Sequence, residues 1–474
     1  MHESDEARAV LEIQRAALRA EGVATAPARR DRLDRALDLL VSHQAEICEA
    51  IAADFTRRPA TLTRFADVLP SVLALKHARR HLRRWMRPQR QRLGLPAGAP
   101  GVRAEIVHQP LGVVGVISPW NFPITLTFGP LAGILAAGNR CMIKPSELTP
   151  AVSSLLRRLV RKYFDAREVA VVTGDADVAQ AFSRLPFDHL LFTGSTSVGR
   201  RVMAAAAENL VPVTLELGGK CPVLIGRSAD LKRAVDRIML GKLGNAGQMC
   251  IAPDYVCVPD ELLDGIIQEA RSWVERAYPA TSTNPDYTSM VSDRHAERMR
   301  ALLADALAKG ARLIFLDPHG DGGPASGRVV SPALVLDATD EMRVMQEEIF
   351  GPLLPLRTYR RIEESIAEIN ARPRPLALYY FGTDRTEMQQ VLAHTISGGV
   401  TVNDIAMHFL AEELPFGGIG ASGMGAYHGA HGFLRFSHAR AVFYQGRFNV
   451  AGLVGLRPPY GKRAERVLNW LIRR

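Results

Sequence analysis

Cysteine is scarce in this sequence, and its spacing argues against two common roles. The 474 residues include five cysteines: Cys48, Cys141, Cys221, Cys250 and Cys257. An odd number without framework spacing is not typical of a disulfide-stapled extracellular protein and favours reduced thiols in a cytoplasm. No group of cysteines and histidines has metal-ligand spacing, so we expect no metal site.

Long apolar runs and a secretory leader are also missing. No stretch of about 18 consecutive apolar residues occurs, so we expect no transmembrane segment. Residues Met1 to Glu6 are polar and acidic, unlike a signal peptide. The hydrophobic content of 47% and charged content of 23% are typical of a globular chain, and the length predicts two or more domains.

Positive charge is in excess and is concentrated in one segment. The formal net charge is +10, and much of it lies between Lys76 and Arg92. A patch for nucleic acid or an anionic membrane is one interpretation. Leu82, Trp85 and Met86 nevertheless recur at helical spacing. We therefore interpret the segment as the solvated face of an amphipathic helix and expect no nucleic-acid partner.

The strongest candidate for chemistry is the loop Gly244–Cys250, with the sequence GNAGQMC. A glycine-flanked polar loop presents a thiol beside backbone N–H groups. Such donors lower the pKa of the thiol and hold an oxyanion formed next to it. The alternative is that Cys250 is a small hydrophobe like the other cysteines, and the loop alone does not decide between them.

Two other stretches carry polar groups in unusual surroundings. Glu216 lies between two leucines near the end of an apolar run, where a raised pKa would suit a general base. The alternative is a strand-end carboxylate exposed to water. Asn121 lies in Ser118–Pro123 between aromatic residues and prolines, with a side-chain amide free to donate. The alternative there is an ordinary proline-rich turn.

Together the three stretches resemble the aldehyde dehydrogenase superfamily. Its signatures are an Asn in a Pro-Trp-Asn-Phe-Pro-like motif, a Glu in Leu-Glu-Leu-Gly-Gly-Lys and a Cys in Gly-Gln-x-Cys, matched here by Asn121, Glu216 and Cys250. The order of the motifs and the Glu-to-Cys separation also match the family. The resemblance runs from about residue 30 to the C-terminus.

This resemblance implies a covalent mechanism. The Cys250 thiolate would attack the aldehyde carbon, and Asn121 with the Cys250 backbone N–H would hold the oxyanion. Hydride transfer would leave a thioester, which water activated by Glu216 would hydrolyse. Two alternatives come from other classes: a cysteine hydrolase with His408 as base, and a protein of the same fold with a silent site.

The expected fold class is α/β. Residues 8 to 92 are predicted to be helices, broken at Pro70 and Pro88, and strands alternate with helices after Leu111, which implies parallel sheets. The expected strands are Ala104–Gln109, Val113–Ile117, Cys141–Ile143, Val169–Val172, His189–Phe192, Pro222–Ile225, Tyr255–Val258 and Arg312–Leu316. The glycine-rich turn Phe416–Gly425 is expected to route the backbone near the site.

The resemblance divides the chain into three parts. It implies a Rossmann-type nucleotide-binding domain over residues 1–92 and 110–217, the helical N-terminal part included. An α/β catalytic domain would cover residues 218–429. A small β oligomerisation flap and a C-terminal tail would cover residues 93–109 and 430–474.

A nicotinamide dinucleotide is the expected cofactor. Gly194, Ser195 and Gly199 lie at a strand-to-helix turn where a pyrophosphate can approach a helix N-terminus, although the spacing is not that of the usual dinucleotide fingerprint. In the family, the residues matching Lys144 and Glu147 contact the adenosine ribose. A carboxylate there favours NAD, because it would repel a 2′-phosphate, while Lys144 leaves NADP as an alternative.

Three further positions complete the predicted cofactor site. By resemblance, Glu348 binds the nicotinamide ribose, Phe350 backs the nicotinamide ring, and Trp120 lies beside them. As bare sequence, the carboxylate pair at Glu347 and Glu348 is most often only solvated.

The substrate is expected to be a small-molecule aldehyde. Within the family, the sequence is most similar to the class 3-like branch and, in it, to bacterial coniferyl aldehyde dehydrogenases, which implies coniferyl or a related aromatic aldehyde. Trp120, Phe122, Phe128 and Tyr255 could line an apolar funnel or could be core aromatics. Medium- and long-chain fatty aldehydes are the alternative substrates, because apolar pockets discriminate only about 1–3 kcal/mol per methylene.

Relatives in this branch are usually homodimers. The expected pairing elements are the strand near Ile106 and the segment Ala439–Tyr444. The basic amphipathic tail from Leu456 is expected to pack on the partner subunit, with weak contact to a membrane surface as the alternative. Two residues depart from the family pattern: Thr56 stands where relatives usually carry glycine, and Met249 is bulkier than the usual residue before the cysteine.

Overall fold

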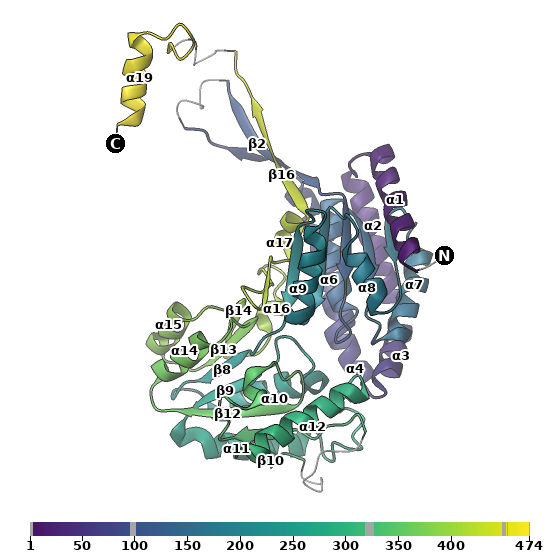
Figure 1. Cartoon of the computed structure of the whole chain (residues 1–474), viewed down its shortest axis with the longest axis vertical. Coiled ribbons are helices and arrows are strands. Elements are labelled where there is room, and N and C mark those ends of the chain that lie inside the picture. The colour runs from purple at the N-terminus through teal and green to yellow at the C-terminus, as the bar shows by residue number, and fades with distance from the viewer. Residues whose placement is uncertain (1–2, 95–100, 318–326, 448–451, 453, 474) are drawn as a thin grey trace.

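The computed structural model describes residues 3–94, 101–317, 327–447, 452 and 454–473 (Figure 1). Its helices are α1 (Glu3–Glu21), α2 (Ala26–Ser42), α3 (Gln44–Phe55), α4 (Ala60–Thr63), α5 (Leu69–Trp85), α6 (Thr125–Ala137), α7 (Pro150–Tyr163), α8 (Ala176–Ser183), α9 (Thr196–Ala207), α10 (Leu231–Leu243), α11 (Leu263–Ala277), α12 (Asp293–Ala308), α13 (Arg343–Gln346), α14 (Ile362–Ala371), α15 (Arg385–His394), α16 (Met407–Leu410), α17 (Gly429–Arg435) and α19 (Lys462–Ile472). In the described part of the chain, no helix combines the length and apolar composition needed to cross a membrane.

The first large sheet has the order β15-β7-β6-β3-β4-β5. Its strands are β3 (Val113–Ile117), β4 (Arg140–Lys144), β5 (Val169–Val171), β6 (His189–Gly194), β7 (Val213–Leu217) and β15 (Gly423–Met424). All neighbours are parallel except β15, which runs antiparallel to β7. Parallel strands covered on both faces are continuous apolar runs, and every residue of β3 is buried accordingly.

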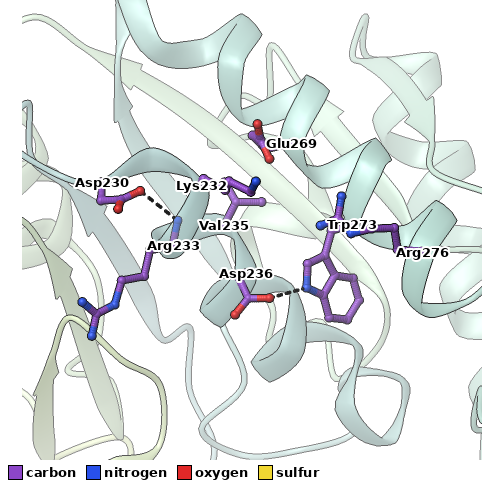
Figure 2. Close-up of a pocket in the computed structure, with 8 residues that line it drawn as sticks. All are labelled: Asp230, Lys232, Arg233, Val235, Asp236, Glu269, Trp273 and Arg276. Atoms are coloured by element: carbon purple, nitrogen blue, oxygen red, sulfur yellow. Dashed lines mark hydrogen bonds between the residues drawn. The ribbon is translucent and has the colours of Figure 1, made fainter.

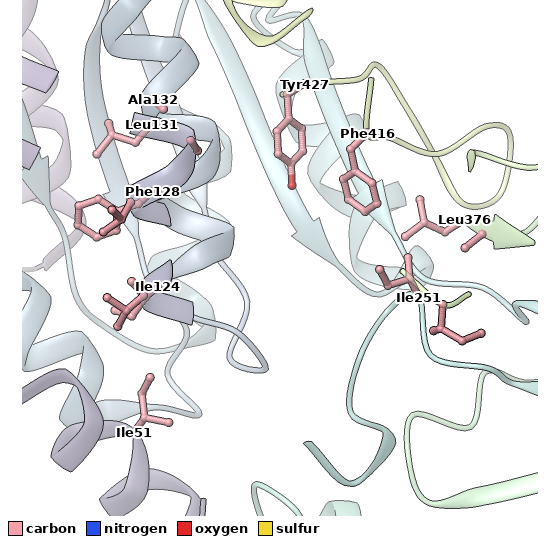
Figure 3. Close-up of a cluster of buried hydrophobic side chains, with 14 of the residues drawn as sticks. Ile51, Ile124, Phe128, Leu131, Ala132, Ile251, Leu376, Phe416 and Tyr427 are labelled. Atoms are coloured by element: carbon pink, nitrogen blue, oxygen red, sulfur yellow. The ribbon is translucent and has the colours of Figure 1, made fainter. Parts of the chain in front are cut away.

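Helix α6 is the central support of this sheet. It is buried on nearly all sides and packs against α2, α5 and α17. Gly133 permits the approach of α17, because a Cβ there would lie 3.0 Å from the backbone of Gly432. One continuous hydrophobic cluster links Ile124 and Phe128 at this helix to Phe416 and Tyr427, far along the chain (Figure 3). The segment that carries Phe416 and Tyr427 therefore packs against α6 and the first sheet.

The second large sheet has the order β10-β11-β12-β9-β8-β13-β14. Its strands are β8 (Pro222–Ile225), β9 (Tyr255–Pro259), β10 (Arg312–Phe315), β11 (Ala333–Leu336), β12 (Leu353–Tyr359), β13 (Ala377–Phe381) and β14 (Gly399–Val402). Only β10 is antiparallel to its neighbour. Two α/β layers of this kind confirm the predicted fold class.

A third, small sheet forms an arm. Strands β1 (Gln89–Gln91), β2 (Arg103–Pro110) and β16 (Ser437–Tyr444) pair antiparallel, and the arm extends from the body towards α19 (Figure 1). The predicted strand near Ile106 and segment Ala439–Tyr444 are thus hydrogen-bonded to each other. Strand β15 lies inside the predicted catalytic range 218–429 but pairs with the first sheet. The domain limits stay a prediction.

The prediction of a helix break at Pro70 was wrong. Helical structure continues from α4 through a π-helical turn (Arg64–Val68) into α5, and Pro70 lies in the first turn of α5. A proline is tolerated in a first helical turn, where its missing N–H leaves little unsatisfied. The second break is confirmed, since α5 ends at Trp85 just before Pro88.

The backbone conformation of Thr56 bears on one departure from the family pattern, threonine in place of the usual glycine. Thr56 caps the C-terminus of α3 with φ = 66°, in the left-handed region where glycine carries no steric penalty. The family glycine expected at this position suits this backbone conformation. Threonine is β-branched, so it occupies the conformation under strain.

Candidate active site

The Cys250 loop is built from consecutive residues in a rare backbone conformation. Asn245 and Ala246 each have φ = 52° and Gly247 has φ = 74°. A side chain at Gly247 would collide with the carbonyl of Gly351, so only glycine fits there. Left-handed residues of this kind persist where surrounding contacts over-determine them, and they cluster at functional sites.

Gln248 holds this loop in place from inside. It is fully buried, its Nε2 donates to the carbonyls of Asn245 (3.0 Å) and Ser289 (3.1 Å), and its Oε1 accepts from the Val291 N–H (3.0 Å). The Gln248 carbonyl in turn accepts from Asn121 Nδ2 at 3.1 Å. The structure thus brings Asn121 next to the Cys250 loop, with one amide hydrogen already engaged.

A buried ion pair that the sequence did not reveal positions Asn121. Arg58 donates to the Asn121 carbonyl (2.6 Å) and pairs with Asp67 at 2.5 Å. Asp67 also accepts from the N–H groups of Ile124 (3.0 Å) and Thr125 (3.2 Å). Neither charged side chain is exposed to solvent. We name this set of contacts the Arg58–Asp67 clamp.

Glu216 lies in β7 and is buried, so the solvent-exposed alternative is excluded. Among the described residues, neither carboxylate oxygen has a hydrogen-bond partner. Burial, and then the charge of Glu348, raise the pKa of Glu216 to about 8. A carboxyl group kept unpaired in an apolar setting with such a pKa has the properties of a general base.

Glu348 follows α13 in the chain and lies close enough to Glu216 for its charge to raise the pKa of Glu216. Burial and then the charge of Asp254 raise the pKa of Glu348 to about 8, while Gly219 N–H and Lys220 act in the opposite direction. Lys220 pairs with Asp254 and donates to the Glu347 carbonyl (3.2 Å), which ties the Glu348 loop to the turn after Glu216.

The expectation of a lowered Cys250 pKa was wrong for this structure. Burial raises the pKa of the Cys250 thiol well above its usual value, the charges of Glu216 and Glu348 raise it further, and the opposing effect of the Cys250 backbone N–H does not offset them. The Cys250 carbonyl accepts from the Cys221 thiol at 3.4 Å. Because two carboxyl groups face the thiol, its proton needs a base to leave, and Glu216 is within electrostatic reach.

A cleft of 440 Å³ adjoins these groups and suits a dinucleotide. It is lined by Thr196 and Arg200 of α9, by Gly218 and Gly219, and by Glu348, among others. A side chain at Gly218 would collide with the Glu348 carboxylate. The first turn of α9 and a glycine-walled cradle are the features that accept a pyrophosphate.

The predicted phosphate turn has a clear structural basis. Ser195 caps α9 and accepts from the Val198 N–H, and the Thr196 hydroxyl donates to the Ala421 carbonyl (3.1 Å). Gly199 permits close packing of α9 on the first sheet, because a Cβ there would lie 2.7 Å from Leu217. Gly194 ends β6, and a Cβ there would meet the Phe192 ring.

The remaining predicted cofactor residues form two pairs. Lys144 Nζ lies 3.7 Å from the Glu147 carboxylate, which is 43% exposed. The rings of Trp120 and Phe350 meet edge-on with centroids 5.3 Å apart, and Trp120 also contacts His295. Phe350 has φ = 52°, a strained conformation for a bulky residue. Neither pair lines the 440 Å³ cleft.

His408, the alternative base, is engaged in the core. Its Nδ1 lies 2.7 Å from the Thr401 hydroxyl, and it packs against Phe416. Burial lowers its pKa to about 4. A base with so low a pKa gains protons poorly near neutrality, which argues against a cysteine–histidine pair.

The aromatic residues expected around the substrate divide between core and site. Phe128 and Tyr255 are fully buried core residues, and Phe122 covers the Arg58 guanidinium at 4.8 Å. The sequence interpretation assigned no site role to Tyr427, whose hydroxyl is buried, has no hydrogen-bond partner among the described residues and feels the charges of Glu216 and Cys250. The glycine-rich turn Phe416–Gly425, just before it, was the signal for this segment.

A separate cavity of 310 Å³ lies between α10 and α11 (Figure 2). The indole of Trp273 donates to Asp236 there at 2.9 Å. Acidic and basic side chains alternate around it, and none of the predicted site residues lines it. Within the described residues, no group of three or more histidine, cysteine or acidic side chains could hold a metal ion.

Comparisons with known proteins identify the family. Residues 1–442 match the family described as "Aldehyde dehydrogenase family". The chain is 54% identical over 97% of its length to "Probable coniferyl aldehyde dehydrogenase" of Caulobacter vibrioides, covering 95% of that protein. It is 49% identical to "Coniferyl aldehyde dehydrogenase" of a Pseudomonas species, covering 95% of this chain and 93% of that protein.

Solved structures show the same similarity. The substrate-bound state of Staphylococcus aureus AldH superposes with a TM-score of 0.91 at 35% identity, covering 98% of this chain and 99% of that one. Mycobacterium tuberculosis aldehyde dehydrogenase complexed with NAD+ gives a TM-score of 0.84 at 26% identity, covering 94% and 91%.

Proposed function

The chain belongs to the aldehyde dehydrogenase family and oxidises aldehydes with a nicotinamide dinucleotide, and we propose that its substrate is coniferyl aldehyde or a related phenylpropenal. The observation that carries this proposal is the near full-length identity of 49% and 54% to two relatives named for that substrate. The family and the site geometry support the acid as product.

We propose that Cys250 is the nucleophile. Its sulfur forms a bond to the aldehyde carbon, the thiol proton passes to a base, and the carbonyl oxygen becomes an oxyanion. Asn121 has one amide hydrogen left after its bond to Gln248, and the Cys250 N–H supplies a second donor. Losing one such donor typically raises the barrier by about 2.7–4 kcal/mol.

We propose that Glu216 is the base of the hydrolysis step. Its buried, unpaired carboxyl group, with a pKa near 8, can take a proton from water once the thioester has formed. That water oxygen bonds to the thioester carbon, the carbon–sulfur bond breaks, and the acid leaves with Cys250 restored. The bound dinucleotide supplies hydride acceptance between the attack by Cys250 and this hydrolysis.

The cleft beside Glu348 supports the proposed cofactor contacts. The first turn of α9, with Ser195 and Gly199, would receive the pyrophosphate, and Gly194 precedes it. Glu348 would bind the nicotinamide ribose, while Phe350 and Trp120 would flank the ring. Lys144 and Glu147 would contact the adenosine ribose, and the partly exposed Glu147 carboxylate supports a preference for NAD over NADP.

The direct test measures kcat/KM by the absorbance of the reduced cofactor. Coniferyl aldehyde, benzaldehyde and decanal would each be run with NAD and with NADP. We expect the highest value for coniferyl aldehyde with NAD. A preference for decanal would overturn the proposed substrate and indicate a fatty-aldehyde enzyme with the same mechanism.

The residue roles are tested by two substitutions. Cys250→Ala should abolish oxidation, because it removes the proposed nucleophile. Glu216→Gln should still bind cofactor but accumulate acyl-enzyme, which quenched-flow mass spectrometry detects as added mass on the chain. Normal turnover of the Gln variant would contradict the assigned role.

We further propose a cytoplasmic homodimer. Strand β16 is an edge strand whose outer side is unpaired among the described residues, and Phe443 and Tyr444 next to its end are exposed. In α19, Trp470 and Ile472 are exposed and suit a cover on the partner. The free cysteines fit a reducing compartment. Light scattering should give twice the chain mass, while binding to anionic vesicles would favour a membrane contact for α19.

A further inference from the structure

A small hollow lies between the N-terminal half of α6, the start of α5 and the segment after α16. It is lined by Leu73, Gly129, Phe409, Glu412 and His428, among others. Its volume of 20 Å³ has room for about one water-sized group. Most of the wall is apolar, and the polar groups come from Glu412 and His428 on one side.

His428 is held there at a conformational cost. Its φ of 87° is unusual for a residue with a side chain, and its ring stacks on Phe416 with centroids 5.3 Å apart. The ring also contacts Phe409 (5.1 Å). His428 is only 4% exposed, and its Nδ1 has no hydrogen-bond partner among the described residues. A buried polar atom without a partner is uncommon and is open to a hydrogen bond from a polar group that enters the hollow.

Glu412 supplies the second polar group. Its side chain is partly buried, and burial raises the pKa of Glu412 to about 7, an effect opposed by the Gly429 N–H and reinforced by Glu413. Burial, and then the charge of His408, lower the pKa of His428 to about 3, so its imidazole is neutral near pH 7. A carboxyl group and a neutral imidazole can together satisfy one hydroxyl as donor and acceptor.

Tyr427 relates the hollow to the catalytic groups by its position in the chain and by electrostatics. This residue precedes His428, and its buried hydroxyl feels the charges of Glu216, Cys250 and Glu412 together. Thr125, in the same wall as Gly129, is held by the Arg58–Asp67 clamp next to Asn121. Tyr427 is therefore within electrostatic reach of both the catalytic groups and Glu412.

We propose that Glu412 and His428 form the subsite for the phenolic hydroxyl of the aromatic aldehyde. This inference rests on the proposed function, because it assigns the ring's polar end to a place in the same site. The hydroxyl donates to the Glu412 carboxylate and pairs with His428 Nδ1, while Leu73 and Phe409 contact apolar ring substituents. An aliphatic aldehyde leaves both groups unpaired, which discriminates against it.

The test compares substrates that differ only at the hydroxyl: coniferyl aldehyde, its phenolic methyl ether and cinnamaldehyde. A hydrogen bond to a charged group changes affinity by about 10- to 100-fold when fully buried, and Glu412 is partly exposed, so we expect about tenfold higher kcat/KM for the phenol in the wild type. Glu412→Leu should bring that ratio close to one.

Two variants make the outcome decisive. Glu412→Gln keeps the side-chain shape and should lower the ratio partly, and Glu413→Gln, at an exposed neighbour, should leave it unchanged. Because the ratio is internal to each preparation, partial misfolding does not affect it. An unchanged ratio in both Glu412 variants, or a wild-type ratio near one, overturns this subsite alone. A wild type that oxidises none of the three overturns the proposed substrate as well.

Discussion

Replacing Asp67 with asparagine should damage both stability and catalysis, because it breaks the Arg58–Asp67 clamp without changing its shape. Asparagine can still accept from the Ile124 and Thr125 N–H groups, but its amide nitrogen would face the Arg58 guanidinium. A buried cation would then have no counter-ion. Breaking a buried ion pair in this way typically costs 3–5 kcal/mol of unfolding free energy.

The catalytic effect follows from the Asn121 backbone. Arg58 donates to the Asn121 carbonyl, so a shifted guanidinium moves the Asn121 amide that binds the Gln248 carbonyl in the Cys250 loop. Complete loss of an oxyanion donor raises the barrier by about 2.7–4 kcal/mol. Asn245 Nδ2 still holds the same carbonyl at 3.1 Å, so we expect a partial effect: a roughly tenfold lower kcat with KM within about threefold.

The assay combines urea unfolding with steady-state kinetics on the same preparation. Asp165→Asn is the matched control, because Asp165 also pairs with an arginine, Arg167, but at the surface, where the pair should matter little. If the Asp67 variant kept wild-type stability and kcat, the clamp would not position Asn121, and this reasoning would be refuted.

Three further predictions test single residues. Thr56→Gly should raise the unfolding free energy by about 1 kcal/mol by removing left-handed strain, measured as a higher urea midpoint; a lower midpoint would show that the contact of Thr56 with Arg328 matters more. Glu216 binds a proton in the folded state up to a pKa of about 8, so its contribution is most favourable below pH 4.5 and falls with rising pH until about 8. The stability advantage of Glu216→Gln over wild type should therefore grow from pH 5 to 8 and then level off, and a constant difference would contradict the raised pKa. Glu147→Ser should raise kcat/KM for NADP relative to NAD several-fold, because a carboxylate no longer repels the 2′-phosphate; an unchanged ratio would place the ribose elsewhere.

Local sequence signals predicted most regular elements well. Strands Val113–Ile117 and Pro222–Ile225 have the predicted limits, because short β-branched runs between turns leave few alternatives. Pro70 misled because a proline is compatible with a first helical turn, and where that turn starts depends on the preceding π turn. Tyr255, suggested for the substrate funnel, is in the core because side-chain direction in a strand is set by its neighbours.

The site was predictable only where a residue type and its neighbours announce chemistry. Cys250, Glu216 and Asn121 stand in glycine- or proline-marked stretches, and the structure brings all three together, although their roles stay predictions. Arg58 and Asp67 carried no such signal, because Asn121 and Ile124, which they contact, are more than 50 residues away. In sequence, a buried ion pair also looks like two ordinary surface charges. The prediction of a lowered Cys250 pKa was wrong for the same reason, because Glu216 and Glu348, which raise that pKa, come from distant elements.

The pairing of β15 with β7 has a consequence for the order in which the protein matures on the ribosome. Glu216 pairs in register with Gly423, so the edge of the sheet that carries the base stays open to water until more than 200 further residues have been synthesised. Until then the carboxyl group lacks this cover, and burial is the main cause of its raised pKa. The environment of the base is therefore completed only after residue 423 has been synthesised.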